Sequence, residues 1–264
     1  PQVDRALQVL WSNYHIYEPF SIFREVNFSA NQYSVWDFGA NRVALGANLN
    51  TFAQLTNYWK AFGGLSLSGE QRSSSALRGG SALLEPGYKY ARIGIFTNPQ
   101  KQLTFELMGG QYFSNEKGFR SIADYNLSIG YRPLKSLRID IAPGLNTYKN
   151  DLQYVTQNDF QNGTRYVMAH IDRSTVNMSL RINLNISPDL TIQYWGQPFI
   201  ATGEYSEFKH ITNSKADNLN DRYNTYSDDQ ISFDTNSETY LIDDDLDGTI
   251  DYSFDKPDFN VKEF

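Results

Sequence analysis

The residues with the clearest potential for chemistry lie in an acidic stretch near the end of the chain. They form the pattern D-x-D-x-D-G-x-x-D, in which alternating carboxylates precede a glycine that permits a sharp turn. Such a pattern builds an oxygen cage of the kind that Ca²⁺ prefers. The predicted ligands are Asp243, Asp245, Asp247, the backbone carbonyl of Thr249, and Asp251. We therefore predict a calcium ion that orders this loop and takes no part in catalysis.

The motif differs from an EF-hand at its closing position. Position 12, which is a bidentate Glu in an EF-hand, is Phe254 here. The stretch is closer to the short calcium loops of extracellular repeat modules. The plainer alternative is a solvated acidic loop that holds no ion.

The chain has three histidines, so few positions could supply a histidine for catalysis. His170 has an acid and a hydroxyl close in sequence, at Asp172 and Ser174, which is the combination that a hydrolase of lipid or peptide needs. Neighbours two residues apart on a strand are a weak signal, so a polar histidine at a rim is the preferred interpretation. We predict no catalytic residues.

The element that positions these residues is a long β-hairpin at 176–199. From Val176 to Ile186 apolar and polar residues alternate without a break, which places all the apolar side chains on one face of a strand. The segment 187–189 turns the chain, and alternation resumes at Leu190. Eleven residues exceed the usual ~5–6 residues of a soluble strand and match the ~9–11 residues of a membrane-spanning strand.

The rest of the chain repeats this unit. Ten strands are predicted, at 5–16, 22–33, 41–51, 57–70, 88–97, 102–112, 122–132, 137–148, 176–186 and 190–199. Their connections alternate between short turns (17–21, 52–56, 98–101, 132–136, 187–189) and longer segments (34–40, 71–86, 113–121, 149–164, 202–258). Short turns on one side and long loops on the other are typical of an outer-membrane barrel.

The residue types on the polar face of the predicted strands support the same fold class. The side opposite the apolar face is rich in Asn, Ser and Gly, with charges at Glu106, Arg138, Asp140 and Arg181 that we expect to pair inside a lumen. We predict an all-β, antiparallel up-and-down transmembrane β-barrel. The 264 residues form one segment of about ten strands from a larger barrel, with a long extracellular loop at 202–258. A soluble, tyrosine-rich sandwich or adhesin is the alternative.

Composition narrows the function classes. The net charge of -7 argues against nucleic acid as a partner, and the absence of cysteine excludes disulfides and thiolate metal sites. No apolar run is long enough for a transmembrane helix. The 18 Tyr and 17 Phe suit a barrel with aromatic residues at the membrane interfaces.

Short motifs in a specific order resemble the DUF5916 barrel domain of Bacteroidota and related bacteria. They are 57–59 (NYW), 77–80 (LRGG), 131–133 (YRP), 151–155 (DLQYV), 165–167 (RYV), 187–190 (SPDL) running on to 197–199 (QPF), 203–208 (GEYSEF) and 257–260 (PDFN). The resemblance implies a bacterial outer-membrane barrel that follows a family-9-like carbohydrate-binding sandwich. It supplies no catalytic residues.

These observations favour a non-enzymatic, surface-exposed barrel for binding, passage or complex assembly, linked to glycan handling. Its expected partners are outer-membrane lipid, a glycan ligand and a membrane-protein complex. A plug-gated transporter of the TonB-dependent type and a barrel hydrolase are the alternatives.

Overall fold

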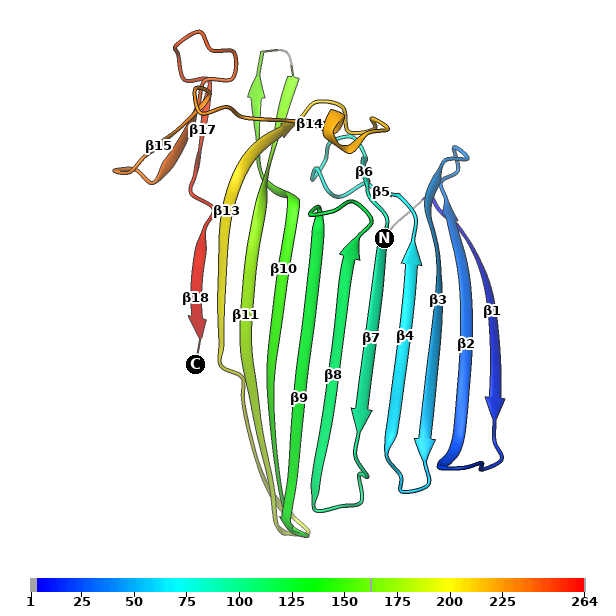
Figure 1. Ribbon diagram of the computed structural model, residues 1–264. Coiled ribbons are helices and arrows are strands. Elements are labelled where there is room, and N and C mark those ends of the chain that lie inside the picture. The colour runs from blue at the N-terminus through cyan, green and yellow to red at the C-terminus, as the bar shows by residue number, and fades with distance from the viewer. Residues whose placement is uncertain (1–3, 162, 264) are drawn as a thin grey trace.

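The computed structural model describes residues 4–161 and 163–263 as a large antiparallel β-sheet with two small sheets at one end (Figure 1). The strands of the main sheet are β1 (Ala6–Ile16), β2 (Phe23–Trp36), β3 (Arg42–Leu55), β4 (Lys60–Ser68), β7 (Tyr88–Phe96), β8 (Leu103–Ser114), β9 (Arg120–Leu134), β10 (Leu137–Phe160), β11 (Gly163–Ser187), β12 (Leu190–Gly196), β13 (Phe199–Ile211), β14 (Tyr223–Thr225) and β18 (Phe259–Glu263). The predicted all-β, antiparallel architecture is confirmed.

Neighbouring strands in the sheet follow one another along the chain. The path runs from β1 through β4, then β7 to β11 and β13, while β12 also pairs with β11 and β18 pairs with β13. The short turns lie together at the bottom of Figure 1 and the longer connections at the top. The predicted alternation in length is confirmed only in part: 69–87 and the connection after β13 are long, whereas 37–41 and 115–119 are no longer than the turn at 17–22, and β11 begins three residues after β10 ends.

One turn is displaced from its predicted place. β3 continues to Leu55 and β4 begins at Lys60, so the turn lies at 56–59 and not at 52–56. Asn57 accepts a hydrogen bond from the Trp59 backbone N–H at 3.0 Å, and Tyr58 has a φ of 69°. The turn chemistry of asparagine decides the boundary here.

Three segments predicted as longer connections contain regular structure. Residues 149–164 continue β10 and β11 into a hairpin whose strands are 24 and 25 residues long. β13 extends to Ile211, and the connection after it contains a 3-10 helix at Leu219–Arg222, β14 and a sheet of β15 (Ile231–Asp234), β16 (Thr239–Ile242) and β17 (Tyr252–Asp255). The segment 71–86 carries the small hairpin of β5 (Gln71–Ser73) and β6 (Leu83–Glu85). Their polar composition concealed these strands.

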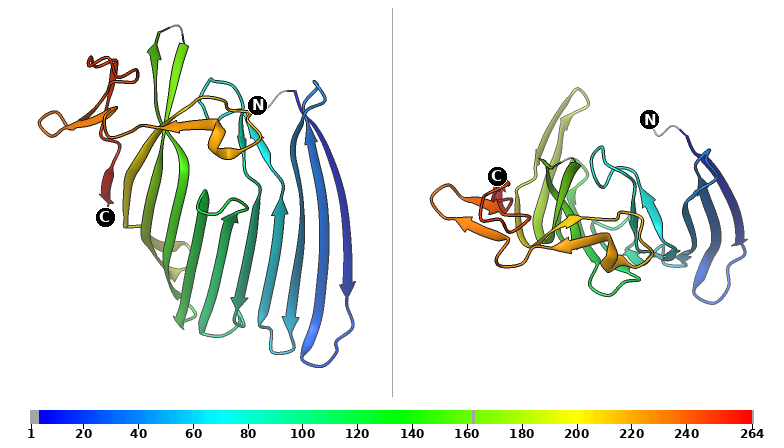
Figure 2. Two further views of the ribbon diagram at one scale, coloured as in Figure 1. Left: turned by 45° about the horizontal axis from the view of Figure 1, so that its top comes forward. Right: turned by 90° about the horizontal axis from the view of Figure 1, so that it is seen from above.

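The sheet has two edges and does not close on itself within the described residues. β1 forms one edge, and β12, β14 and β18 lie at the other (Figure 2). Among the described residues, no helix is both long and apolar enough to cross a membrane.

The two faces of the sheet differ sharply. Directly opposed residues share a face, and one face carries mostly apolar rows such as Thr51, Gly63, Ile93, Gly109 and Tyr125. Its large side chains are exposed, with Leu65 at 59% and Ile93 at 61%. Large side chains of this face are exposed from β1 to β13, at Leu10 (66%), Leu107 (53%) and Ile200 (40%) among others.

The opposite, polar face is held by side-chain hydrogen bonds and by aromatic rings that cover glycines. Asn31 donates to Asn48 at 2.9 Å, and Asn50 also donates to Asn48, at 2.7 Å. Phe62 covers Gly94 so closely that a Cβ there would lie 2.1 Å from the ring. Glycine is required at that position because the ring occupies the space of a side chain.

Buried apolar clusters lie at the end of the molecule that carries the long connections. One cluster joins β11 and β13 to β15–β17 through Val167, Ala169, Phe208, Tyr226, Ile242, Tyr252 and Phe254. A second joins the segment 71–86 to β10 and β11 through Leu77, Leu83, Phe119, Leu152 and Met168. The core therefore fixes the loop end, and the long body of the sheet keeps its apolar residues exposed.

Candidate functional site

The acidic loop folds around its own carboxylates. Oxygens of Asp243, Asp245 and Asp247 lie within 4.8 Å of one another. Asp243 accepts hydrogen bonds from the backbone N–H groups of Asp247 at 3.1 Å and Gly248 at 2.9 Å. Gly248 has a φ of 89°, which confirms the predicted sharp turn. The structure thus brings three of the five predicted ligands together.

The other two predicted ligands belong to residues that brace the loop: the bonds of Thr249 come from its N–H and hydroxyl and leave its backbone carbonyl out, and Asp251 binds the backbone of Asp244. The Thr249 backbone N–H and hydroxyl both donate to Asp247, at 2.8 and 2.5 Å, and these bonds hold the pKa of Asp247 below its ordinary value. Asp251 accepts from the Asp244 backbone N–H through Oδ2 at 2.7 Å, which closes the loop. The loop is therefore preformed by backbone bonds, with Asp251 at its base.

Asp244 anchors the acidic loop to the main sheet. Its carboxylate is 2% exposed and accepts a hydrogen bond from Arg165 Nε of β11 at 2.7 Å. His210 of β13 places Nδ1 3.6 Å from the other carboxylate oxygen. Burial lowers the pKa of His210, against the opposing charge of Asp244 and with a smaller lowering by Arg165. This buried cluster was not predicted, because its members lie far apart in sequence.

The segments 69–87 and 212–225 are bound to each other over the loop end of the sheet (Figures 1 and 2). Arg222, at 1% exposure, donates to the carbonyls of Ala216, Asp217 and Leu84 and to the Glu70 carboxylate. The Leu84 backbone N–H donates to the Ser214 carbonyl at 2.9 Å. We call this pair of segments the cap.

Of the four charges predicted to pair on the polar face, Arg138 and Asp140 form an ion pair, while no ion pair within the described residues involves Glu106 or Arg181. Arg138 donates to Asp140 at 2.8 Å, as predicted for lumen charges, and Arg181 lies opposite Asp140 in the ladder. Near the cap, Arg120 and Glu85 form a two-bond pair at 3.1 and 3.2 Å.

His170 has a different partner from those close in sequence. Its Nδ1 lies 2.5 Å from the Asp151 carboxylate, and Asp172 is bound by Lys149. A hairpin partner, rather than a neighbour along the strand, therefore orients this histidine.

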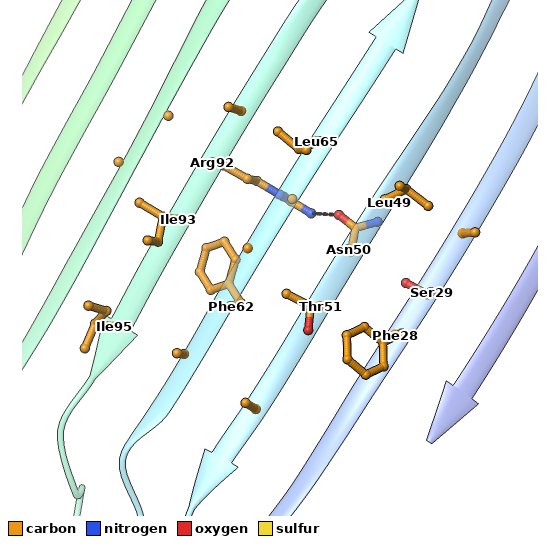
Figure 3. A pocket seen from close by; sticks show the side chains of 18 of the residues that line it. Phe28, Ser29, Leu49, Asn50, Thr51, Phe62, Leu65, Arg92, Ile93 and Ile95 are labelled. Carbon is orange, nitrogen blue, oxygen red and sulfur yellow. Dashed lines mark hydrogen bonds between the residues drawn. The ribbon is translucent and has the colours of Figure 1, made fainter. Parts of the chain in front are cut away.

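A hollow of about 1000 Å³ lies on the apolar face, over β2, β3, β4, β7 and β8 (Figure 3). Small residues form its floor: Ala30, Ala53, Ala61, Gly63, Ala91 and Gly109. Larger side chains rise on both sides, with Phe28 and Leu49 on one and Ile93 and Ile95 on the other. A second hollow of about 580 Å³ continues toward the loop end and shares Ala30, Leu49 and Ala91 with the first. We call the two together the apolar groove.

Comparison with known proteins identifies the family. The model of a domain of unknown function, DUF5916, matches residues 3–244. The chain belongs to this family. No curated protein and no solved structure matches the chain.

The DUF5916 match covers some of the features described above and leaves others outside it. It includes the whole sheet from β1 to β13, the cap, His210 and Asp244. It ends inside the acidic loop, before Asp245, Asp247 and Asp251. Membership in DUF5916 therefore covers the anchor of the loop and gives no support to its cation chemistry.

Proposed function

We propose that this DUF5916 chain forms the wall of a bacterial outer-membrane β-barrel, of which it is one part. The observation that carries the proposal is the exposed apolar face, which runs across ten strands while the buried clusters lie only at the loop end. Exposed apolar surface of this extent is stable against lipid and costly in water. The polar face, with its amide and charge pairs, would then line the lumen.

The proposed role is non-enzymatic: a surface-exposed barrel for binding, passage or assembly, in which the cap and the three-stranded sheet are the parts outside the membrane. Both are rigidly held, by Arg222 and by the Asp244 cluster. A rigid platform next to a polar lumen suits recognition of a ligand, including a glycan, or of a partner protein. Planar-bilayer conductance of the full-length protein distinguishes passage from pure binding.

We also propose that the acidic loop binds calcium. Three clustered carboxylates in a preformed turn support this, with Asp251 offering the oxygen that the Asp244 backbone does not use. The ion would reduce carboxylate repulsion in an exposed loop and so stabilise it.

Membrane insertion and orientation can be tested with single cysteines, because the chain has none of its own. In intact cells, an impermeant maleimide should label Asp228→Cys, which is exposed on the long-loop side, and leave Gln100→Cys, in a short turn, unlabelled. The purified protein should also float with phospholipid vesicles. Failure to float, or equal labelling of both positions, would contradict the proposal.

A further inference from the structure

The upper end of the apolar groove carries a lysine. Lys89 lies on the apolar face of β7, directly between Leu67 of β4 and Phe113 of β8, and it lines the second hollow. Its side chain is exposed, and no carboxylate of the described residues lies within 4.0 Å of its ammonium group. The groove therefore ends in an uncompensated positive charge.

The same row of the sheet shows what is unusual about Lys89. The row continues through Ser121 to Lys149, Asp172 and Glu204, which lie on the same face. Lys149 is neutralised by Asp172 at 2.5 Å. Lys89 has no such partner, although it lies at the same level of the sheet.

A second polar group lies just below the lysine. Gln111 of β8 lines both hollows and is opposite Ala91, so it is a diagonal neighbour of Lys89, about 7–8 Å away. Gln111 accepts a hydrogen bond from the Tyr125 hydroxyl at 3.4 Å, which leaves its amide NH₂ free of that bond as a donor. A cation and an amide donor at one end of an apolar channel match the phosphate and ester groups of a lipid.

The length of the groove agrees with an acyl chain. From Lys89 down to Ile95 there are six residue steps, or about 20 Å along the strand. One leaflet of a bilayer has a hydrocarbon depth of about 15 Å. A lipid with its headgroup at Lys89 would thus extend its chains along the groove floor of Ala and Gly.

We propose that the apolar groove is a specific site for an anionic diacyl phospholipid, with its phosphate on Lys89, its ester region at Gln111 and its chains over Ala91 and Gly63. This inference rests on the proposed membrane location. The lipid fills the hollow between the flanking side chains, where loosely ordered lipid would pack poorly.

The test is lipid retention by the purified full-length protein in native mass spectrometry, with phosphatidylglycerol and phosphatidylcholine offered in equal amounts. The wild type should retain phosphatidylglycerol preferentially. Lys89→Ala should lower that retention about fivefold and leave phosphatidylcholine unchanged, since one lysine near an anionic headgroup contributes about that factor. Lys149→Ala is the matched control, because its charge is already paired.

A second pair of variants tests the channel itself. Ala91→Phe, or the milder Ala30→Leu, fills the floor and should reduce retention of both lipids severalfold. Val176→Phe, on the same apolar face outside the groove, should have no effect. Glycerol phosphate, which has the headgroup chemistry without chains, should not be retained.

Two results would overturn the inference: unchanged phosphatidylglycerol retention in Lys89→Ala, or unchanged retention of both lipids in the two floor variants. Vesicle flotation of the same preparations separates the possible failures. A protein that floats but shows no lipid preference contradicts the groove site alone, whereas one that does not float contradicts the membrane proposal as well.

Discussion

At the scale of single residues, the acidic loop shows how backbone bonds prepare a possible cation cage. Asp243 and Asp247 are both bound to backbone N–H groups of their own loop, so their carboxylates are held near Asp245 before any ion arrives. Calcium would then offset the mutual repulsion of three clustered negative charges. The stability of the loop should depend on the ion and on each carboxylate.

Calcium binding predicts a chelation-dependent melting temperature. Adding EGTA to the folded protein should lower the Tm, and Asp245→Ala should abolish that shift because it removes a ligand that makes no other bond in the loop. Asp228→Ala, an exposed acid outside the motif, should keep the shift. The measurement is thermal unfolding monitored by circular dichroism, and a wild type insensitive to EGTA would refute the site.

The contact of Gly94 with Phe62 makes a second prediction at this scale. Gly94→Ala places a Cβ 2.1 Å from the ring, so the ring or the backbone must move, at a cost of about 1–3 kcal/mol. Gly163→Ala, where a Cβ meets nothing within 4 Å, should be near neutral. Urea unfolding in detergent measures both, and the double variant Phe62→Ala/Gly94→Ala should remove most of the clash penalty.

At the scale of elements, the buried Asp244 joins the three-stranded sheet to β11 and β13. Asp244→Asn leaves Arg165 without its anion, and we expect a loss of about 1–3 kcal/mol, moderated because Arg165 is one-third exposed. The loss should appear as faster hydrogen exchange in β15–β17 and in the hairpin extension of β10 and β11. Asp229→Asn, in the same connection but exposed, serves as the control. Unchanged exchange in Asp244→Asn would show that the apolar cluster alone holds the sheet.

The same cluster predicts a pH dependence. Burial lowers the pKa of His210 below its unfolded value of about 6.5, so the folded state favours the neutral imidazole. The neutral His210 makes its full contribution to the free energy of unfolding above pH 6.5. That contribution is lost as the pH falls toward the pKa that His210 has in the folded state. Docking of β15–β17 should therefore loosen on acidification in the wild type and less so in His210→Gln. Limited proteolysis of residues 226–256 between pH 7.5 and 5.5 measures this, and a wild type that becomes more resistant at low pH would contradict it.

The sequence predicts the body of the sheet well and its loop end poorly. Alternation identifies nine of the ten long strands, β1–β4 and β7–β11, because each has one apolar face, as at Val176–Ile186, and Asn, Pro and Gly mark most turns. The tenth predicted strand, 190–199, corresponds to the short β12, whereas β13 lies mostly in the segment predicted as a loop. The hairpin extension at 149–164 has polar residues on both faces, so its sequence indicates a polar excursion and does not fix the bounds of the two strands. Asp244, His210 and Arg222 escape because distant segments bury them, and no local pattern records such contacts. The sequence gives only a weak indication of the groove, because small residues stand at apolar-face positions where large ones are usual: Ala61, Gly63, Ala91 and Gly109.

At the scale of the whole molecule, the question is which face of the sheet meets lipid. Arg92 and Ile93 are neighbours on β7, yet Ile93 lies on the apolar face and Arg92 lies on the polar face, where it donates to Asn50 at 3.1 Å (Figure 3). In a membrane barrel Ile93 should contact lipid and Arg92 should contact lumen water. A soluble sheet that folds its apolar face inward reverses this arrangement.

Spin labels at single cysteines decide between the two arrangements. In vesicles, a label at Ile93→Cys should collide preferentially with oxygen, which concentrates in hydrocarbon, and a label at Arg92→Cys with a water-soluble nickel complex. The alternation should recur at Leu65→Cys and Ser66→Cys on β4, which face the same two sides. Oxygen preference at the even-numbered positions, or none at either, would exclude the wall proposed here, because the period of two along a strand leaves no other way to place these side chains in a bilayer.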